Sequence, residues 1–213
     1  MSDEQIDLKL KQFDEFFSIT HQFSINATPL INGHNISYNE FVNDMPTPFK
    51  LANDIEILDQ AALAPLGAIS GIAGQLVQYL NHQAKKIDLL VNHILSEQDD
   101  KEYRFQGTNF GGGGIEFASH TSLHLNDVIE LKIFLIDENC AIYCHAEVIS
   151  IEERILVAAK GKNDSHSEKE YHHKVIFHQI REDDRERLVR SSLHLQSKQL
   201  QQLAKERNQQ SNQ

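Results

Sequence analysis

Apolar side chains recur with a seven-residue period between residues 65 and 98, and this period predicts one long helix. The repeat occupies two series of positions, namely Leu66, Ala73, Leu80, Ile87 and Ile94, and Ile69, Leu76, Gln83 and Leu90. This is the a/d pattern of a coiled coil, sustained over about four heptads. Val77, Ala84 and Val91 widen the stripe, so the helix can pack against more than one neighbour. We therefore expect self-association through residues 66–94; the alternative is a helix that packs only within its own domain.

The period changes to two after residue 100, which is typical of β-strands. Short runs with this alternation, separated by turn residues, lie at 102–106, 115–118, 128–136, 141–151, 155–159 and 174–180. No long helix interrupts them, so neighbouring strands should pair antiparallel, because parallel pairing needs long crossover connections. These strands predict a small barrel or sandwich.

Helical patterns flank the strand region on both sides. Ser37 and Glu40 fit a capping box, which predicts a helix start in the N-terminal segment. Acidic residues at 182–184 favour a second helix start, and an amphipathic pattern follows them. We divide the chain into a mostly helical N-terminal segment (1–64), an oligomerisation helix (65–98), a barrel (99–180) and a C-terminal amphipathic helix with a polar tail (181–213).

Composition narrows the class of protein. The 213 residues are 40% hydrophobic and 24% charged, which is the composition of a globular chain. A net charge of −11 repels phosphate backbones and anionic lipid, so we expect no nucleic-acid and no membrane partner. No apolar run is long enough to span a bilayer, and the charged first residues do not form a signal peptide. We therefore expect the protein in the cytoplasm.

Other candidate chemistry is sparse. Cys140 and Cys144 would share one face of a strand but lie about 13 Å apart, so we expect small core residues rather than a disulfide. The chain has 12 histidines, yet His82 and His93 would lie about 16 Å apart on a helix, too far to share an ion. No catalytic triad or carboxylate pair stands out. We expect no metal, no cofactor and no enzymatic activity.

The most unusual segment contains four consecutive glycines between Phe110 and Ile115. Such a run can expose successive backbone N–H groups and cradle a phosphate, or it can form a tight structural turn. It is not a P-loop, because no Lys-Ser/Thr follows. It is not a dinucleotide fingerprint either, because a strand rather than a helix comes next. The chemistry alone leaves both a ligand site and a turn open.

The stretch from Asn109 to Phe117, Asn-Phe-Gly-Gly-Gly-Gly-Ile-Glu-Phe, resembles the Asp/Asn-x-Ser-x-x-Gly motif of PilZ domains. The stretch from Val175 to Val189 is similar to the last strand and acidic helix start of that family, and the heptad helices resemble those of its atypical tetrameric group. The resemblance covers residues 100–200. It implies an α+β fold: a small six-stranded antiparallel PilZ-like barrel, long amphipathic heptad helices before and after it, and a helical N-terminal segment.

PilZ domains are associated with the bacterial second messenger cyclic di-GMP, so the resemblance also implies a ligand site. Asn109 matches the acidic or amide position and Gly114 the closing glycine, whereas Gly111 replaces the serine. The paired arginines upstream of the barrel are absent, and Arg104 is the only arginine nearby. The candidate ligand-binding residues are therefore Arg104, Asn109, Gly111, Gly112, Gly113 and Gly114.

Without the paired arginines, we expect direct binding of cyclic di-GMP to be weak or absent. The resemblance implies a non-enzymatic receptor or adaptor in cyclic di-GMP-linked control of motility, pili or biofilm, with a protein partner of unknown identity. The alternative is a purely structural oligomeric adaptor that binds no nucleotide.

Overall fold

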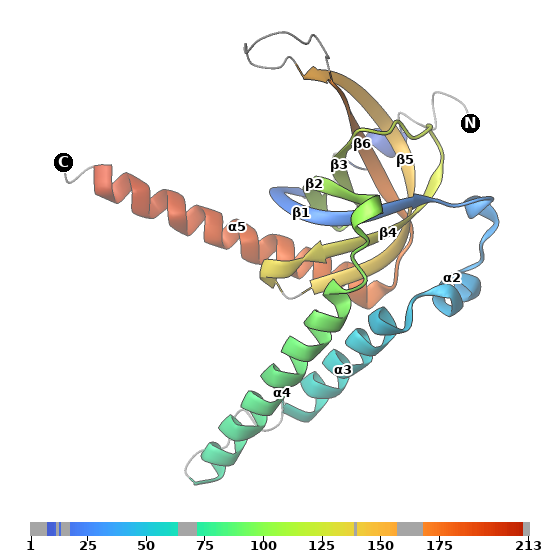
Figure 1. Ribbon diagram of the computed structural model, residues 1–213. Helices are drawn as coiled ribbons and strands as arrows, with labels where there is room; N and C mark the ends of the chain where they lie inside the picture. The colour runs from blue at the N-terminus through green and yellow to red at the C-terminus, as the bar shows by residue number, and fades with distance from the viewer. Residues whose placement is uncertain are drawn as a thin grey trace.

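The computed structural model describes residues 8–11, 13, 18–63, 72–138, 140–156 and 168–210 (Figure 1). Six antiparallel strands form a closed barrel in the order β1-β2-β3-β6-β5-β4. Their bounds are β1 Ser18–Pro29, β2 Arg104–Gly111, β3 Gly114–Ser119, β4 Val128–Leu135, β5 Cys140–Leu156 and β6 Glu168–Gln179. The predicted α+β fold, a six-stranded antiparallel barrel with helices before and after it, is confirmed.

The strand that closes the barrel comes from the segment that we expected to be mostly helical. β1 pairs with β2 on one side and with β4 on the other, so that Ile25 lies opposite both Phe105 and Ile133. Its inward residues Ile19, Phe23, Ile25 and Ala27 are buried, but the half-buried His21 stands between the first two, so the apolar alternation that would have predicted a strand is interrupted there. The N-terminal segment is thus partly a barrel strand.

A second correction concerns the number of strands at the end of the barrel. The runs at 141–151 and 155–159 were expected to be separate strands, but residues 140–156 form the single strand β5. The polar residues Glu152, Glu153 and Arg154 continue the pairing with β6 instead of forming a turn. The end of β5 extends past the barrel, so both of its faces meet solvent and can carry polar residues. The alternation of apolar and polar residues that predicts a strand is therefore missing there.

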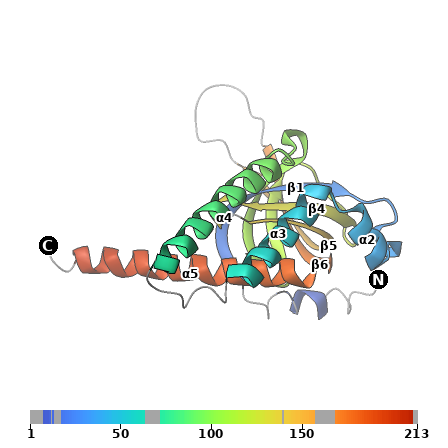
Figure 2. The same ribbon diagram turned by 90° about the horizontal axis from the view of Figure 1, so that it is seen from below.

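The helices form an insertion between β1 and β2 and an extension after β6. The insertion contains η1 (Gly33–Asn35), α2 (Tyr38–Asp44), α3 (Thr47–Leu63), α4 (Ile72–Ser96) and η3 (Lys101–Tyr103); η4 (Ile136–Glu138) joins β4 to β5, and α5 (Glu182–Gln210) ends the chain. α3 and α4 lie side by side and project from the barrel (Figures 1 and 2). Pro65, Leu66 and Ile69 of the predicted long helix lie outside the described residues. Among the helices that the structure describes, none is apolar over enough of its length to cross a membrane.

Local sequence explains where the helices of the insertion begin. The predicted capping box is present: the Glu40 amide donates to Ser37 Oγ over 3.3 Å, and the Ser37 amide donates to Glu40 Oε2 over 2.8 Å. α3 begins at Thr47 and holds Pro48 in its first turn, where proline is tolerated because its missing N–H has no intrahelical partner to lose.

Two apolar clusters hold the barrel and the helices together. The first fills the barrel and includes the fully buried Phe110, Ile115 and Phe117, together with Leu188 of α5. The buried Cys144 belongs to this cluster, as the sequence predicted. The second lies on the outer face of β4 and β5 and joins strand to helix; its buried members are Phe41, Met45, Phe49, Ala52, Leu95, Phe134, Ala141 and Tyr143.

Phe41 of α2 anchors the second cluster. Its ring stacks on Tyr143 with centroids 5.7 Å apart and is fully buried. We expect Phe41→Ala to lower the free energy of unfolding by about 3–5 kcal/mol, because it leaves a cavity under α2. Urea denaturation measures this loss. Tyr38→Ala, on the exposed face of the same helix, is the control and should cost about 1 kcal/mol or less. Equal losses in the two variants would contradict this account of the cluster.

Candidate functional site

The four glycines join β2 to β3 and lie against the beginning of α5. All four are buried. Arg185 Nη1 donates to the Gly112 carbonyl over 2.9 Å, and the Phe177 amide donates to the Gly113 carbonyl over 3.0 Å. A Cβ on Gly114 would collide with the Val175 carbonyl oxygen of β6. The hairpin therefore serves as a turn that lets α5 and β6 approach the backbone closely.

Asn109 lies in the middle of a polar row on the outer face of the barrel. Its Nδ2 donates to Glu116 Oε2 over 2.7 Å, and Lys174 Nζ lies 3.4 Å from the other carboxylate oxygen of Glu116. Asn109 Oδ1 is buried and accepts no hydrogen bond from the described residues. The position that matches the family's acidic or amide residue thus keeps an unused acceptor.

The structure does not bring Arg104 to the glycine hairpin. Arg104 begins β2 and Gly111 ends it, so the two are separated by the length of the strand, about 23 Å. The Arg104 guanidinium instead forms a two-point ion pair with Asp99, with contacts of 3.0 and 2.8 Å. Of the predicted site residues, Asn109 and the four glycines therefore lie together, and Arg104 lies apart.

The arginine that does reach the hairpin is Arg185, which the sequence reasoning missed. Arg181 directly precedes α5 and Arg185 lies four residues later in its first turns, so this spacing places them on one side of the helix start. Arg181 donates to Asp184 Oδ2 over 2.7 Å and to the Phe49 carbonyl over 3.0 Å, so it ties α5 to α3. Burial raises the pKa of Asp184 against the opposing effect of Arg181. The spacing was a usable signal, but we sought arginines only upstream of the barrel.

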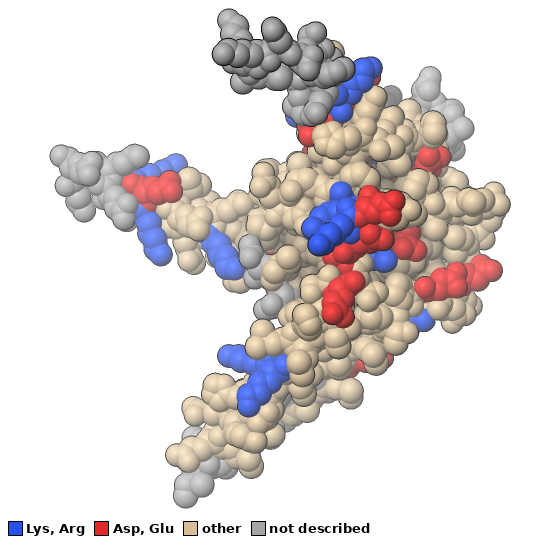
Figure 3. Space-filling view, viewed as in Figure 1, with Lys and Arg blue, Asp and Glu red and all other residues tan. Residues whose placement is uncertain are grey.

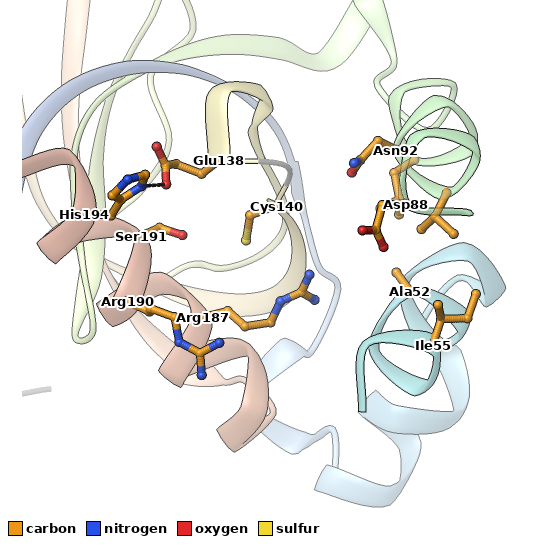
Figure 4. A pocket seen from close by; sticks show the side chains of 12 residues that line it. Ala52, Ile55, Asp88, Asn92, Glu138, Cys140, Arg187, Arg190, Ser191 and His194 are labelled. Carbon is orange, nitrogen blue, oxygen red and sulfur yellow. Dashed lines mark hydrogen bonds and ion pairs between the residues drawn. The ribbon is translucent and has the colours of Figure 1, made fainter. Parts of the chain in front are cut away.

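A cavity of about 560 Å³ separates α5 from the α3–α4 pair (Figure 4). Arg187, Arg190 and His194 of α5 line one side, and Asp88 and Asn92 of α4 line the other. Figure 4 shows the Arg187 guanidinium extending from α5 toward α4. The lining residues carry both positive and negative charges. The cavity can therefore accommodate a polar segment or ligand, but it is not a site specific for anions.

Glu138 fixes the edge of this cavity. Its carboxylate accepts hydrogen bonds from His194 Nδ1 over 2.5 Å and from Lys198 Nζ over 2.9 Å. Burial opposes ionisation of Glu138, but these two hydrogen bonds outweigh burial and lower its pKa below the usual value. The contact holds the middle of α5 against η4. It is a structural ion pair rather than an acid or a base poised for proton transfer.

Comparison with solved structures assigns the fold. The structure matches a crystal structure of a pathogenic protein from Xanthomonas campestris, described as a new tetrameric PilZ domain self-assembled via an unusual helical bundle. This match has a TM-score of 0.54 and 12% identity, and covers 93% of this chain and 99% of that chain. The predicted resemblance is confirmed: the chain has the fold of a PilZ domain protein.

Other PilZ-related structures match over a smaller part of the chain. Apo MrkH of K. pneumonia matches with a TM-score of 0.41 and 19% identity, over 47% of this chain and 43% of that chain. The PilZ domain of YcgR from Escherichia coli with c-di-GMP matches with a TM-score of 0.38 and 16% identity, over 50% of this chain and 83% of that chain. The chain thus spans less than half the length of the MrkH chain. No protein-family model matches the sequence, and no curated protein sequence matches it.

The packing of the glycine hairpin gives a testable difference between two glycines. A Cβ at Gly114 meets backbone, whereas a Cβ at Gly112 meets only the end of the Val189 side chain, 2.8 Å away. We expect Gly114→Ala to lower the free energy of unfolding by about 3 kcal/mol or more and Gly112→Ala by about 1 kcal/mol. Urea denaturation of the two variants checks this. Equal losses would show that the hairpin is not held as described.

Proposed function

We propose that the protein is a non-enzymatic, cytoplasmic PilZ-type signalling adaptor of bacterial origin that works as a homo-oligomer in cyclic di-GMP-linked regulation. The observation that carries the proposal is the end-to-end similarity to a PilZ protein described as tetrameric and assembled through a helical bundle. The likeness includes the helices outside the barrel, since it covers almost the whole of both chains. Two exposed helix faces of this chain support the same use of its helices.

The heptad face of α4 is turned to solvent. Its a and d residues Leu76, Leu80, Ile87, Leu90 and Ile94 are exposed by between 38% and 64%. Val91, at the e position, packs instead against the cluster that joins the helices to the barrel. One edge of the wide stripe is therefore used within the chain. The a/d edge is free for another helix, as the width of the stripe allows.

α5 presents a similar face along most of its length. Val189, Leu193, Leu200 and Leu203 are exposed by 40–60%. In the view of Figure 3, charged residues of both signs gather over the barrel, whereas the projecting α3–α4 pair shows mostly uncharged surface. Contiguous apolar faces of this kind mark interaction sites in a chain that must stay soluble. We assign both faces to copies of the same chain, because the PilZ protein that matches 93% of this chain is described as a tetramer self-assembled via a helical bundle.

Substitutions in the α4 face test the assembly. Leu80→Asp combined with Ile87→Asp places two charges in the proposed interface, so we expect the mass in solution to fall from a multiple of 24.3 kDa toward 24.3 kDa. Light scattering at tens of micromolar protein measures it. Gln78→Asp combined with Asn81→Asp adds two negative charges at exposed positions outside the a/d series and should leave the mass unchanged. A wild-type chain with the mass of one subunit would refute the proposal.

We expect direct binding of cyclic di-GMP to be weak or absent. Arg104 lies at the far end of β2 from the glycine hairpin and is paired with Asp99. Each missing hydrogen bond to a charged group forfeits about 1.5–3 kcal/mol. The absence of two arginines and one hydroxyl therefore weakens a micromolar site by roughly several hundred-fold or more. Arg185 beside the hairpin and the unused Oδ1 of Asn109 favour a residual site.

A calorimetric titration of cyclic di-GMP into the full-length chain decides between receptor and adaptor. We expect no binding in the low micromolar range, which would favour the purely structural adaptor. A low-micromolar dissociation constant that is lost in Asn109→Ala or Arg185→Ala would instead establish a true receptor with its site at the glycine hairpin. Arg154→Ala, an exposed arginine on β5, is the matched control and should leave any binding unchanged.

A further inference from the structure

Two histidines and one glutamate from distant parts of the chain meet on the outer surface of the barrel. His34 lies in η1, Glu147 in β5 and His178 in β6. One possible ligand atom of each lies within 4.8 Å of those of the other two. Two imidazoles and a carboxylate are a recurrent ligand set for Zn²⁺ and similar divalent ions, with the fourth position left to water. We propose that His34, Glu147 and His178 bind a divalent transition-metal ion, for which the Lys9 ammonium competes at Glu147.

Glu147 supplies the charge that such a site requires. It lies on the outer face of β5, because its neighbours Ala146 and Val148 point into the barrel core. Its side chain is only 5% exposed, and Lys9 Nζ lies 2.5 Å from its Oε1. A carboxylate that is nearly removed from water needs a cation beside it. A bound metal ion would satisfy the same need and would release Lys9.

His34 is held in an orientation that suits a ligand. Its Nε2 lies 2.8 Å from the Asn126 carbonyl oxygen. A carbonyl only accepts, so Nε2 carries the hydrogen and Nδ1 of the neutral ring keeps a lone pair. Asn126 has a left-handed backbone conformation, with a φ of 69°, and its amide donates to the Val148 carbonyl over 2.8 Å. A backbone carbonyl that orients the second nitrogen is the usual support of a metal-binding histidine.

His178 is brought to the other two by an irregularity in the sheet. His145 lies opposite Gln179 and Ala146 opposite Phe177, so His178 is an extra residue in β6. Such bulges redirect the side chain that they carry. The His178 ring meets the His34 ring edge to face, with centroids 5.6 Å apart. The bulge in β6, the hydrogen bond to Asn126 and the strand β5 thus bring the side chains of His178, His34 and Glu147 together.

The remaining gap is small. With metal–ligand bonds of about 2.0–2.2 Å, ligand atoms in a tetrahedral site lie about 3.4 Å apart. The exposed His178 imidazole can rotate to close the distance from 4.8 Å or less, while His34 keeps its hydrogen bond to the Asn126 carbonyl. None of these three residues belongs to the glycine hairpin or to the apolar helix faces. Metal binding is therefore a property beyond the proposed function and does not depend on it.

Zinc binding by the intact chain tests the proposal. The full-length protein is freed of metal with a chelator, dialysed and titrated with ZnCl₂ in a calorimeter. We expect one ion per chain, and at least tenfold weaker binding in His34→Ala and in His178→Ala. His120→Ala removes an exposed histidine elsewhere and is the matched control. Lys9→Met should bind Zn²⁺ more tightly than the wild type, because it removes the competing cation.

Two outcomes would overturn the proposal: no binding by the wild type, or equal weakening by His120→Ala and His178→Ala. Unchanged affinity in Lys9→Met would overturn the competition with Lys9. Both replaced imidazoles are exposed, so the variants should keep the fold, which circular dichroism checks. Absorption of bound Co²⁺ in the visible range gives a second readout, which should report tetrahedral coordination in the wild type and be lost in His34→Ala.

Discussion

The closure of the barrel by β1 is the constraint on which the rest of the structure depends. β1 pairs with β2 and with β4, and without it both strands would present open edges. β1 and β2 are neighbours in the barrel, but residues 30–103 separate them in the chain. The helices of this insertion must therefore leave the barrel and return beside the point of departure. They do so as an antiparallel pair, α3 and α4, anchored at one end by Phe49 and Leu95.

Beyond this anchor, the barrel does not cover the apolar face of the helical pair. The outer cluster uses only the part of α4 near Val91 and Leu95, so the apolar a/d face extends into solvent. α5 repeats the arrangement: Leu188 and Leu195 join the barrel core, while its later turns carry exposed leucines. This geometry supports the oligomer that we propose, in which the helices would make the contacts between copies.

The sequence predicts the strongly periodic parts well and the non-local parts poorly. The heptads of α4 and the capping box at Ser37 are local patterns, and the structure contains both. β1 was missed because polar residues such as His21 interrupt its alternation and its partners lie far away in the chain. In the candidate site, the motif located Asn109 and the glycines together. It could not show that Arg104 is remote or that Arg185 is close, since both depend on strand order and on the path of α5. His34, Glu147 and His178 meet only through the bulge in β6, which no spacing in the sequence indicates.

Hydrogen–deuterium exchange along α4 tests the central claim most directly, because amide protection reports how well each helix is held. If other copies cover the a/d face, amides at 76–94 should exchange slowly at high protein concentration and much faster on dilution, while amides of β4 and β5 stay protected throughout. Exchange over residues 76–94 that is the same at all concentrations would contradict the claim that copies of this chain cover the face.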